Sequence, residues 1–439
     1  MLISMNWSGN LSSLDANGDE DGALYGAQTR RALANFAVGG PRLADFPDLV
    51  RGLALVKMAA ASTNARLGVL DREVAGAIVA AAERVSRGEH LGEFVVPVVQ
   101  GGGGTSTHMN ANEVLAGLAS RELARRGIDR PVHPNDHVNA GQSTNDVMPT
   151  AIALAVRAVA DRAAPELWHL IESLEAKAEQ FAGLEHLGRT CLRDAVAAPV
   201  SAVHRSHAFG VRRGVEALAG AVDKLLAVPL GATAVGTGVG AEDGFGPAAV
   251  AELARLSGYP LTEAPDRFYA LSSLEPLVGV AEAVDHCARA VARVGADLRL
   301  LSSGPVGGIG EVELPAVQAG SSIMPGKVNP VLPELVMQIS FQVAGEATSA
   351  RLAAGAGELD VSAMAPVVTA GLLGGLERLG AGARLFADRC VAGLGWNAEN
   401  VRANLAGSLT AAVVAARADG YDVVANRGRD ANARRSHLE

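Results

Sequence analysis

The chain has 439 residues, of which 49% are hydrophobic, 19% are charged and only 4% are aromatic, and its formal net charge is −9. This length and composition indicate a folded protein of more than one structural unit and exclude a disordered chain. The negative charge argues against nucleic acid or an anionic membrane surface as the partner, because either would require a concentrated basic face.

The cysteines and the start of the chain bear on location. Cys191, Cys287 and Cys390 are too widely spaced for a disulfide framework or a zinc site and indicate reduced thiols. The first 22 residues contain no basic start followed by an apolar run, and no run of about 18 apolar residues occurs in the sequence. We therefore expect a cytoplasmic protein without a membrane span.

Residues 1–144 combine short helical patterns with glycine-rich and polar loops. The four glycines at 101–104 and Thr105 would let the backbone approach a ligand closely, although the Lys-Ser/Thr pair of a phosphate loop is missing. His133, Asp136 and His137 could share one helix face and hold a metal ion. Hydrogen bonding to the backbone at a helix start is the interpretation we favour, so no metal is expected.

Three polar residues, Ser143, Thr144 and Asn145, precede a predicted helix that continues towards Ala151. Free N–H groups at a helix start bind anions, so these residues are candidates for a carboxylate site. An ordinary N-cap is the alternative, because serine, threonine and asparagine all favour that position.

Long helical patterns dominate residues 145–392, which predicts an all-α fold around a central helix bundle. One apolar stripe consists of Leu167, Leu170, Ile171, Leu174, Ala178 and Phe181. A second, with the spacing of a bundle seam, consists of Val284, Cys287, Val291, Val294, Leu298 and Leu301. A further helix is predicted to begin near Val331, and a break at 393–401 predicts a small C-terminal domain at 393–439.

The segment GSSIMPGKVNP at 320–330 contains four side chains suited to anion chemistry. Lys327 supplies a positive charge for a carboxylate, and Asn329 can orient it. Ser321 or Ser322, surrounded by backbone N–H groups, could be stabilised as an alkoxide and take a proton. The alternative is an ordinary surface loop between helices.

The chain resembles the aspartase/fumarase superfamily, homotetrameric lyases that form fumarate by trans elimination. The resemblance spans nearly the whole sequence and rests on LYGAQTRRALANF, GGGGTSTHMNANE, HPNDHVNAGQSTND, GRTCLRDA, DLRLLSSGP and GSSIMPGKVNPVLPE, in that order. It implies a three-domain all-α fold whose core takes five long helices from each of four subunits. It also implies active sites shared between three subunits, a small dicarboxylate substrate and no cofactor.

The resemblance also implies roles for individual residues. Ser321 matches the base that removes the proton beside the β-carboxylate. The matches to carboxylate binders are Lys327 and Asn329 for the α-carboxylate, and Ser143 and Thr144 for the β-carboxylate. The matches to positions around the leaving group are Thr105, Asn145 and Thr190. Glu334 and His133 match positions described as supporting or secondary. Cys191 and Ser322 are further candidates for pocket or supporting positions.

Departures from the family pattern bear on the leaving group. Cys191 stands where fumarases carry a histidine, Ala202 replaces a usual glutamine, and the C-terminal domain is short. Together with QGGGGTS and PVLPELVMQI, the missing histidine favours aspartate ammonia-lyase activity. Fumarate hydratase is the main alternative, followed by a lyase for a substituted aspartate or another nitrogen-bearing succinate. A non-catalytic descendant and a metal-dependent enzyme are further alternatives that we do not favour.

Overall fold

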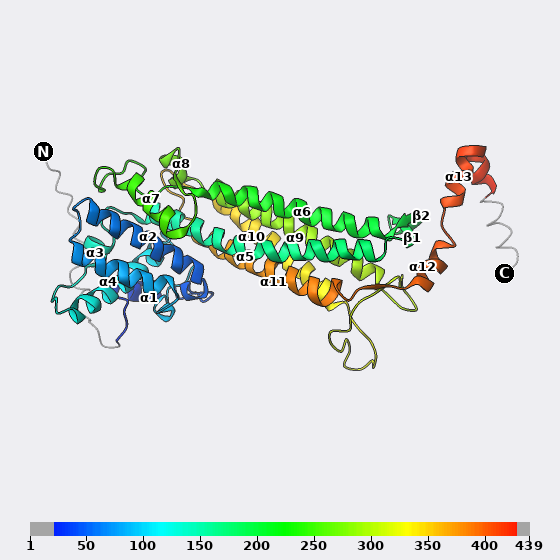
Figure 1. Ribbon diagram of the computed structural model, residues 1–439, viewed down its shortest axis with the longest axis horizontal. Helices are drawn as coiled ribbons and strands as arrows, with labels where there is room; N and C mark the ends of the chain where they lie inside the picture. The colour runs from blue at the N-terminus through cyan, green and yellow to red at the C-terminus, as the bar shows by residue number, and fades with distance from the viewer. Residues whose placement is uncertain (1–21, 428–439) are drawn as a thin grey trace. The chain divides into compact units, whose positions relative to one another are not determined.

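The computed structural model describes residues 22–427, and Figure 1 shows its helices and strands. The described chain is predominantly α-helical, and its strands form only two-stranded sheets, which confirms the all-α prediction. None of the described helices is long and apolar enough to cross a membrane. The expectation that the chain begins without an export signal concerns residues that lie outside the described range.

The chain forms two compact units, each assembled from separated segments. Of the described residues, the first comprises those up to Ala163, together with Glu216–His286 and Phe341–Arg378. The second comprises Ala164–Val215, Cys287–Ser340 and the described residues from Leu379 to 427. The division into domains at 1–144, 145–392 and 393–439 stays a prediction.

The long helices contribute a segment to each unit. Their bounds are α5 (Thr144–Gln180), α6 (Val200–Asp223), α9 (Glu275–Leu301), α10 (Val331–Gly355) and α11 (Ala365–Phe386). The start of α10 at Val331 confirms the predicted helix start after Pro330. Their lengths exceed those of ordinary globular helices, and packing of their apolar faces supplies most of their stability.

The first unit also contains shorter helices, of which α2 and its neighbours support the candidate site. Figure 1 shows α1 to α4 in blue and cyan, with α2 beside α3 and α4, and α7 and α8 in green. At the start of α3, the Asp71 carboxylate accepts hydrogen bonds from the N–H groups of Glu73 and Val74, which satisfies two otherwise unpaired donors. The bounds are α1 (Ala27–Asn35), α2 (Pro47–Arg66), α3 (Arg72–Ser86), α4 (Thr105–Arg125), α7 (Phe245–Ser257) and α8 (Arg267–Ser272).

The predicted apolar stripes form the core of the second unit and extend into the first. All six residues of the α9 stripe are buried, including Cys287, which confirms that this thiol fills the core. The α5 stripe is buried from Leu167 to Ala178, whereas Phe181 lies just beyond the helix end and is half-buried. Gly214 allows α6 to approach α9 closely, since an added Cβ would lie 2.7 Å from the Cα of Cys287.

Short strands and two C-terminal helices complete the described chain. The antiparallel pairs are β1 (Glu185–Thr190) with β2 (Arg193–Pro199) and β5 (Val312–Glu313) with β6 (Gly395–Trp396); the parallel pair is β3 (Ala227–Val228) with β4 (Thr262–Glu263). The expected break near Gly393 leads through β6 into α12 (Ala398–Leu405) and α13 (Thr410–Asp419). The β1–β2 hairpin lies between α5 and α6 and contains the motif GRTCLRDA.

A buried carboxylate anchors this hairpin within the second unit. The Glu311 side chain is fully buried and accepts hydrogen bonds from both terminal nitrogens of Arg189, at 2.7 and 3.0 Å. Asn404 of α12 donates a further bond at 2.8 Å. Burial alone would raise the pKa of Glu311, but the nearby His186, 3.6 Å away, and the bonds from Arg189 and Asn404 lower it to about 2. The hairpin end that carries Thr190 is therefore tied to the rest of the unit through Arg189.

Replacing Glu311 by Ala should destabilise the protein by about 3 kcal/mol, because it leaves the half-buried Arg189 guanidinium without its carboxylate partner. Chemical unfolding of the variant would measure this loss. Because the folded-state pKa is lowered, the contribution of Glu311 is present above its ordinary pKa and is lost as the pH falls towards about 2. Glu313→Ala, a change at an exposed neighbour, serves as the control, and an equal loss there would contradict the assignment.

Candidate active site

The residues predicted for the site fall into two groups, one within each unit. The first unit contains Thr105, His133, Ser143, Thr144 and Asn145. The second contains Thr190, Cys191, Ser321, Ser322, Lys327, Asn329 and Glu334. The first group comes from loops and helix starts, and the second comes from a β-hairpin tip, a loop and a helix start.

In the first group, Ser143 directly precedes α5, and Thr144 and Asn145 are its first two residues, which confirms the predicted helix start. Each residue is half-buried and is held by a different contact. The Asn145 side-chain amide donates to the carbonyl of Ala234 at 2.7 Å, and the Asn145 N–H donates to the Ser143 hydroxyl oxygen at 3.2 Å. Polar side chains at the positive end of a long helix are well placed to receive a carboxylate.

Asp146 organises the backbone around this helix start, and sequence reasoning missed it. Its carboxylate is fully buried and accepts the N–H of Ser143 on one oxygen, at 2.9 Å. The other oxygen accepts the N–H groups of Gly231 and Thr233, at 3.0 and 2.9 Å. The loop that begins at Gly231 is thereby fixed to the start of α5.

Burial raises the pKa of Asp146 to about 6, although the three backbone N–H groups and Lys57 act in the opposite direction. As the pH falls, Asp146 thus binds a proton at a higher pH in the folded chain than in the unfolded chain. Protonation of Asp146 near pH 6 therefore stabilises the folded state. A loss of activity in that pH range would reflect altered site geometry and not unfolding.

We therefore expect kcat/KM to fall as the pH drops through about 6, because a protonated Asp146 is a weaker acceptor for the three N–H groups. The Asp146→Asn variant should have lower kcat/KM at neutral pH and should lack this acid limb. A pH–rate profile measures both, with Asp129→Asn as an exposed control. An unchanged limb in Asp146→Asn would contradict the assignment.

Two further buried residues reach the same helix start and were also missed. Lys57 lies in the middle of α2, with no exposed surface, and its Nζ is 2.7 Å from Nε2 of His108 on α4. The other ring nitrogen of His108 is 2.9 Å from the Thr144 hydroxyl oxygen. A sequence signal existed, because Lys57 is the one charged residue within the apolar run LALVKMAAAS of α2.

Thr105, after the glycine run, and His133 each make a hydrogen bond at a helix start. Thr105 is the first residue of α4, is exposed, and donates its hydroxyl to the carbonyl of Gly102 at 2.6 Å. His133 caps the short helix that follows it, since its Nδ1 accepts the N–H of Asp136 at 3.0 Å. Within residues 22–427, no group of three His, Cys, Asp or Glu side chains is placed to hold a metal ion.

In the second group, the segment at 320–330 is a loop closed at its base. The Gly320 N–H donates to the Lys327 carbonyl at 3.0 Å, and the Asn329 side chain donates to the Gly320 carbonyl at 2.6 Å. Only glycine fits at this base, since a Cβ on Gly320 would lie 2.4 Å from the Lys327 oxygen. Within the loop, the Ser321 hydroxyl oxygen accepts the N–H groups of Ile323 and Met324, at 3.3 and 3.0 Å. These donors would stabilise negative charge on that oxygen.

The loop borders an open hollow of about 850 Å³ within the second unit. Lys327 is exposed, and no ion pair to it is found in the described part of the chain. Glu334 of α10 lies 3.4 Å from Arg299 of α9, so its charge is already matched. The hollow's lining includes Arg299, Ser303, Lys327, Asn329, Glu334 and Asn400. The available cation of Lys327 suits a carboxylate.

Thr190 and Cys191 lie at the tip of the β1–β2 hairpin. Thr190 ends β1, and the tip residues Cys191 and Leu192 both have positive φ, 53° and 58°, as a tight hairpin turn requires. Thr190 and Cys191 are exposed. The hairpin therefore presents both side chains outward, with Arg189 anchoring the strand behind them.

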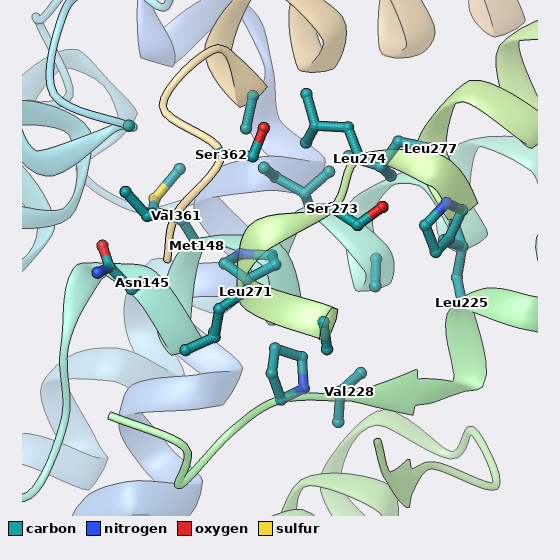
Figure 2. Close-up of a pocket in the computed structure, with 18 of the residues that line it drawn as sticks. Asn145, Met148, Leu225, Val228, Leu271, Ser273, Leu274, Leu277, Val361 and Ser362 are labelled. Carbon is teal, nitrogen blue, oxygen red and sulfur yellow. The ribbon is translucent and has the colours of Figure 1, made fainter. Parts of the chain in front are cut away.

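A mostly apolar cavity of about 80 Å³ lies beside the start of α5, within the first unit. Figure 2 shows Met148, Leu271 and Val361 around it, with Asn145 alongside. Thr144 and Asn145 supply polar groups at its border. The apolar lining includes Met148, Ile152, Val228, Leu271, Leu274 and Val361.

Comparisons with known proteins show which family the chain belongs to. A family model described as a lyase matches residues 17–345. The chain is 41% identical over 412 residues to class II fumarate hydratase of Nitrosomonas europaea, covering 93% of this chain and 89% of that protein. It is 42% identical over 381 residues to aspartate ammonia-lyase of Pseudomonas aeruginosa, covering 86% and 80%.

Solved structures show the same likeness. The fold matches a fumarate lyase:delta crystallin from Brucella melitensis with a TM-score of 0.89 and 39% identity, covering 94% of this chain and 90% of that one. It matches class II fumarase from Schistosoma mansoni with a TM-score of 0.88 and 35% identity, covering 92% and 88%. The chain therefore belongs to the aspartase/fumarase superfamily of lyases and has its all-α fold. Its relatives include a fumarate hydratase and an aspartate ammonia-lyase at nearly equal sequence identity.

Proposed function

We propose that this lyase eliminates ammonia from aspartate, or from an aspartate-like succinate, to give fumarate. The observation that supports it most directly is the Ser321 hydroxyl, which accepts two backbone N–H groups in a loop that also carries Lys327 and Asn329. Such donors lower the free energy of a serine alkoxide, which is the form able to take a proton from carbon.

In the proposed reaction, the Ser321 alkoxide takes a proton from the carbon beside the β-carboxylate. The electron pair of that C–H bond moves into the β-carboxylate, giving an aci-carboxylate with an additional negative charge. The neighbouring C–N bond then breaks, ammonia leaves with the bonding electron pair, and the double bond of fumarate forms. The Ser321 hydroxyl returns its proton to solvent.

The carboxylates of the substrate would be held by the two groups of polar residues. Lys327 and Asn329 are assigned to the α-carboxylate, and Ser143 and Thr144 to the β-carboxylate. Donors to the β-carboxylate matter most in the transition state, because charge accumulates there as the proton leaves. We assign Thr105, Asn145 and Thr190 to the surroundings of the leaving group.

Support for nitrogen as the leaving atom comes from the hairpin tip. Cys191 occupies the position after Thr190 where fumarases carry a histidine, and it is exposed at the turn. Without an imidazole there, a proton donor for a departing hydroxide is missing at that position, whereas ammonia leaves as a neutral molecule from an ammonium group.

A substituted amine is a second candidate, favoured by the cavity beside α5. Its apolar walls border Thr144 and Asn145, so a substituent of a few carbon atoms on the nitrogen could be buried there. Methylamine and larger alkylamines, added with fumarate, would reveal such a preference as a rate that increases from ammonia to the alkylamine.

We propose that the active enzyme is a homotetramer in which three subunits contribute to each active site. The candidate residues at the start of α5, at the hairpin tip and in the 320–330 loop are all partly or fully exposed within one chain. Burial by other subunits would exclude water and strengthen their interaction with a dianion. Light scattering of the purified protein measures the assembly, and a monomer with full activity would contradict it.

The direct test is to follow the ultraviolet absorbance of fumarate in the addition direction. Fumarate with ammonia should be consumed and yield aspartate, whereas fumarate alone should stay constant. Consumption of fumarate without ammonia, with malate as product, would show a hydratase instead. No consumption with water, ammonia or alkylamines would contradict the proposed function.

A further inference from the structure

A chain of buried hydrogen bonds connects Lys57 to the Thr144 hydroxyl through His108. The Lys57 ammonium group has three donors, and three candidate acceptors lie within reach: His108 Nε2 at 2.7 Å, and the side-chain oxygens of Asn139 and Gln142, both at 2.9 Å. Lys57 and His108 are both essentially inaccessible to solvent, so these groups have only one another to satisfy their hydrogen bonds.

The orientation of both amides is fixed independently of Lys57. The Asn139 side-chain NH₂ donates to the Gln142 carbonyl at 3.1 Å. The Gln142 side-chain NH₂ donates to the carbonyls of Val138 and Ala140, at 3.1 Å each. With their nitrogens committed to backbone carbonyls, both amides present oxygen to Lys57, and Lys57 must donate to each.

The third donor of the ammonium then sets the tautomer of His108. If Lys57 donates to Nε2, that nitrogen carries no proton, and the proton of the neutral ring lies on Nδ1. Nδ1–H in turn donates to the Thr144 hydroxyl oxygen, 2.9 Å away. Thr144 then accepts from His108, so its own hydroxyl proton is available to a ligand at the start of α5.

We infer that Lys57 and His108 are positioning residues that fix the Thr144 hydroxyl as a donor to the bound carboxylate. The inference rests on the proposed function, in which Thr144 binds the β-carboxylate. A donor held in advance is most valuable where negative charge develops, because no reorganisation is needed as the proton leaves carbon. Loss of these hydrogen bonds should therefore lower kcat more than it raises KM.

The charge of Lys57 decides the tautomer of His108, and the three acceptors around Nζ match the three donors of the ammonium form. Burial lowers the pKa of Lys57 well below its ordinary value, and the nearby Asp146 carboxylate opposes only part of that shift. Burial also lowers the pKa of His108, as does the charge of Lys57, so the imidazole stays neutral. An uncharged Lys57 amine would instead accept a hydrogen bond from Nε2–H, and the Thr144 hydroxyl would then donate to Nδ1 of His108 and be unavailable to the substrate.

The tautomer of His108 can be measured without any assumption about activity. In protein labelled with ¹⁵N in the histidine rings, the His108 signals are identified as those missing from the His108→Gln variant. We expect a protonated Nδ1 and an unprotonated Nε2 at neutral pH. A protonated Nε2 with a bare Nδ1 would overturn the inference. This result stands even if the wild-type protein transforms neither fumarate nor aspartate, an outcome that would contradict only the proposed function.

Where activity is present, a double-mutant cycle tests whether His108 acts through Thr144. His108→Leu should lower kcat by about 10- to 10²-fold in the wild-type background, a loss somewhat below that of a direct oxyanion donor. In a Thr144→Val background the same change should cost less than about twofold, because the hydroxyl is already absent. An equal loss in both backgrounds would show a merely structural role and overturn the inference.

Two controls separate positioning from folding. In a Ser143→Ala background, His108→Leu should lower kcat by the same roughly 10- to 10²-fold as in the wild type, because Ser143 is not part of the hydrogen-bonded chain from Lys57 to Thr144. His108→Gln should recover most of the activity lost in His108→Leu, since one amide can accept from Lys57 and donate to Thr144. Circular dichroism and thermal unfolding establish that each variant is folded, and a folded His108→Gln no better than His108→Leu would also count against the inference.

Discussion

Replacing Ser321 by Ala is expected to lower kcat by about 10³- to 10⁴-fold, the upper part of the range for loss of a general base. The reason is local, because the Ile323 and Met324 N–H groups point at the Ser321 hydroxyl oxygen, and alanine leaves no atom there to take the proton. Steady-state kinetics with the substrate identified above measure the loss. Binding of a dicarboxylate inhibitor such as succinate should change little, since no carboxylate contact is assigned to Ser321.

The neighbouring serine provides the matched control. Ser322 is exposed, one residue further along the same loop, and Ser322→Ala should lose less than about tenfold. If Ser322→Ala is the more damaging change, the base has been assigned to the wrong hydroxyl. A loss in both variants accompanied by weaker succinate binding would indicate a collapsed loop.

The elements that the sequence predicted well are those whose signal is repeated along the chain. Buried stripes on α5 and α9 recur every three or four residues over several turns, so each position reinforces the assignment. The β1–β2 hairpin was not predicted as strands. Its segments EHLGRT and RDAVAAP are short and lack regular alternation of apolar and polar residues, and its turn uses Cys191 and Leu192 instead of glycine or asparagine.

The sequence indicated the candidate residues in polar loops but not the buried residues that hold them in place. Ser321, Lys327 and Thr144 stand in unusual polar segments, which attract attention in a sequence. Lys57 and His108 are 51 positions apart, and each is meaningful only beside the other. Asp146 looks like an ordinary residue of a first helical turn until its three N–H partners are known.

The hydrogen bonds that close the 320–330 loop could not be predicted from the sequence either. This loop is held at its base by the bonds between Gly320, Lys327 and Asn329. These bonds depend on backbone torsion angles that composition does not specify. They commit the Asn329 amide nitrogen to the Gly320 carbonyl, so that Lys327 is the stronger candidate for the α-carboxylate of the two.

Replacing Lys327 by Met should therefore lower kcat/KM by about 10²- to 10³-fold, as expected when one partner of a close charge pair is removed. Lys327 is exposed beside the hollow and has no ion-pair partner among residues 22–427, so its charge is available to the substrate. The effect should appear mainly in KM and in the dissociation constant of succinate, because the α-carboxylate keeps its charge during the reaction. Calorimetry of succinate binding and steady-state kinetics measure the two quantities separately.

The contrast with Ser321 makes the Lys327 result decisive for the geometry of the loop. Lys327→Arg should recover part of the affinity, since it restores the charge with a different shape. Arg125→Met removes an exposed cation of α4 that already pairs with Glu122 at 3.0 Å, so it controls for net charge and should have little effect. A loss in Lys327→Met confined to kcat, with succinate binding intact, would mean that Lys327 acts on the reacting atoms and that another group holds the α-carboxylate.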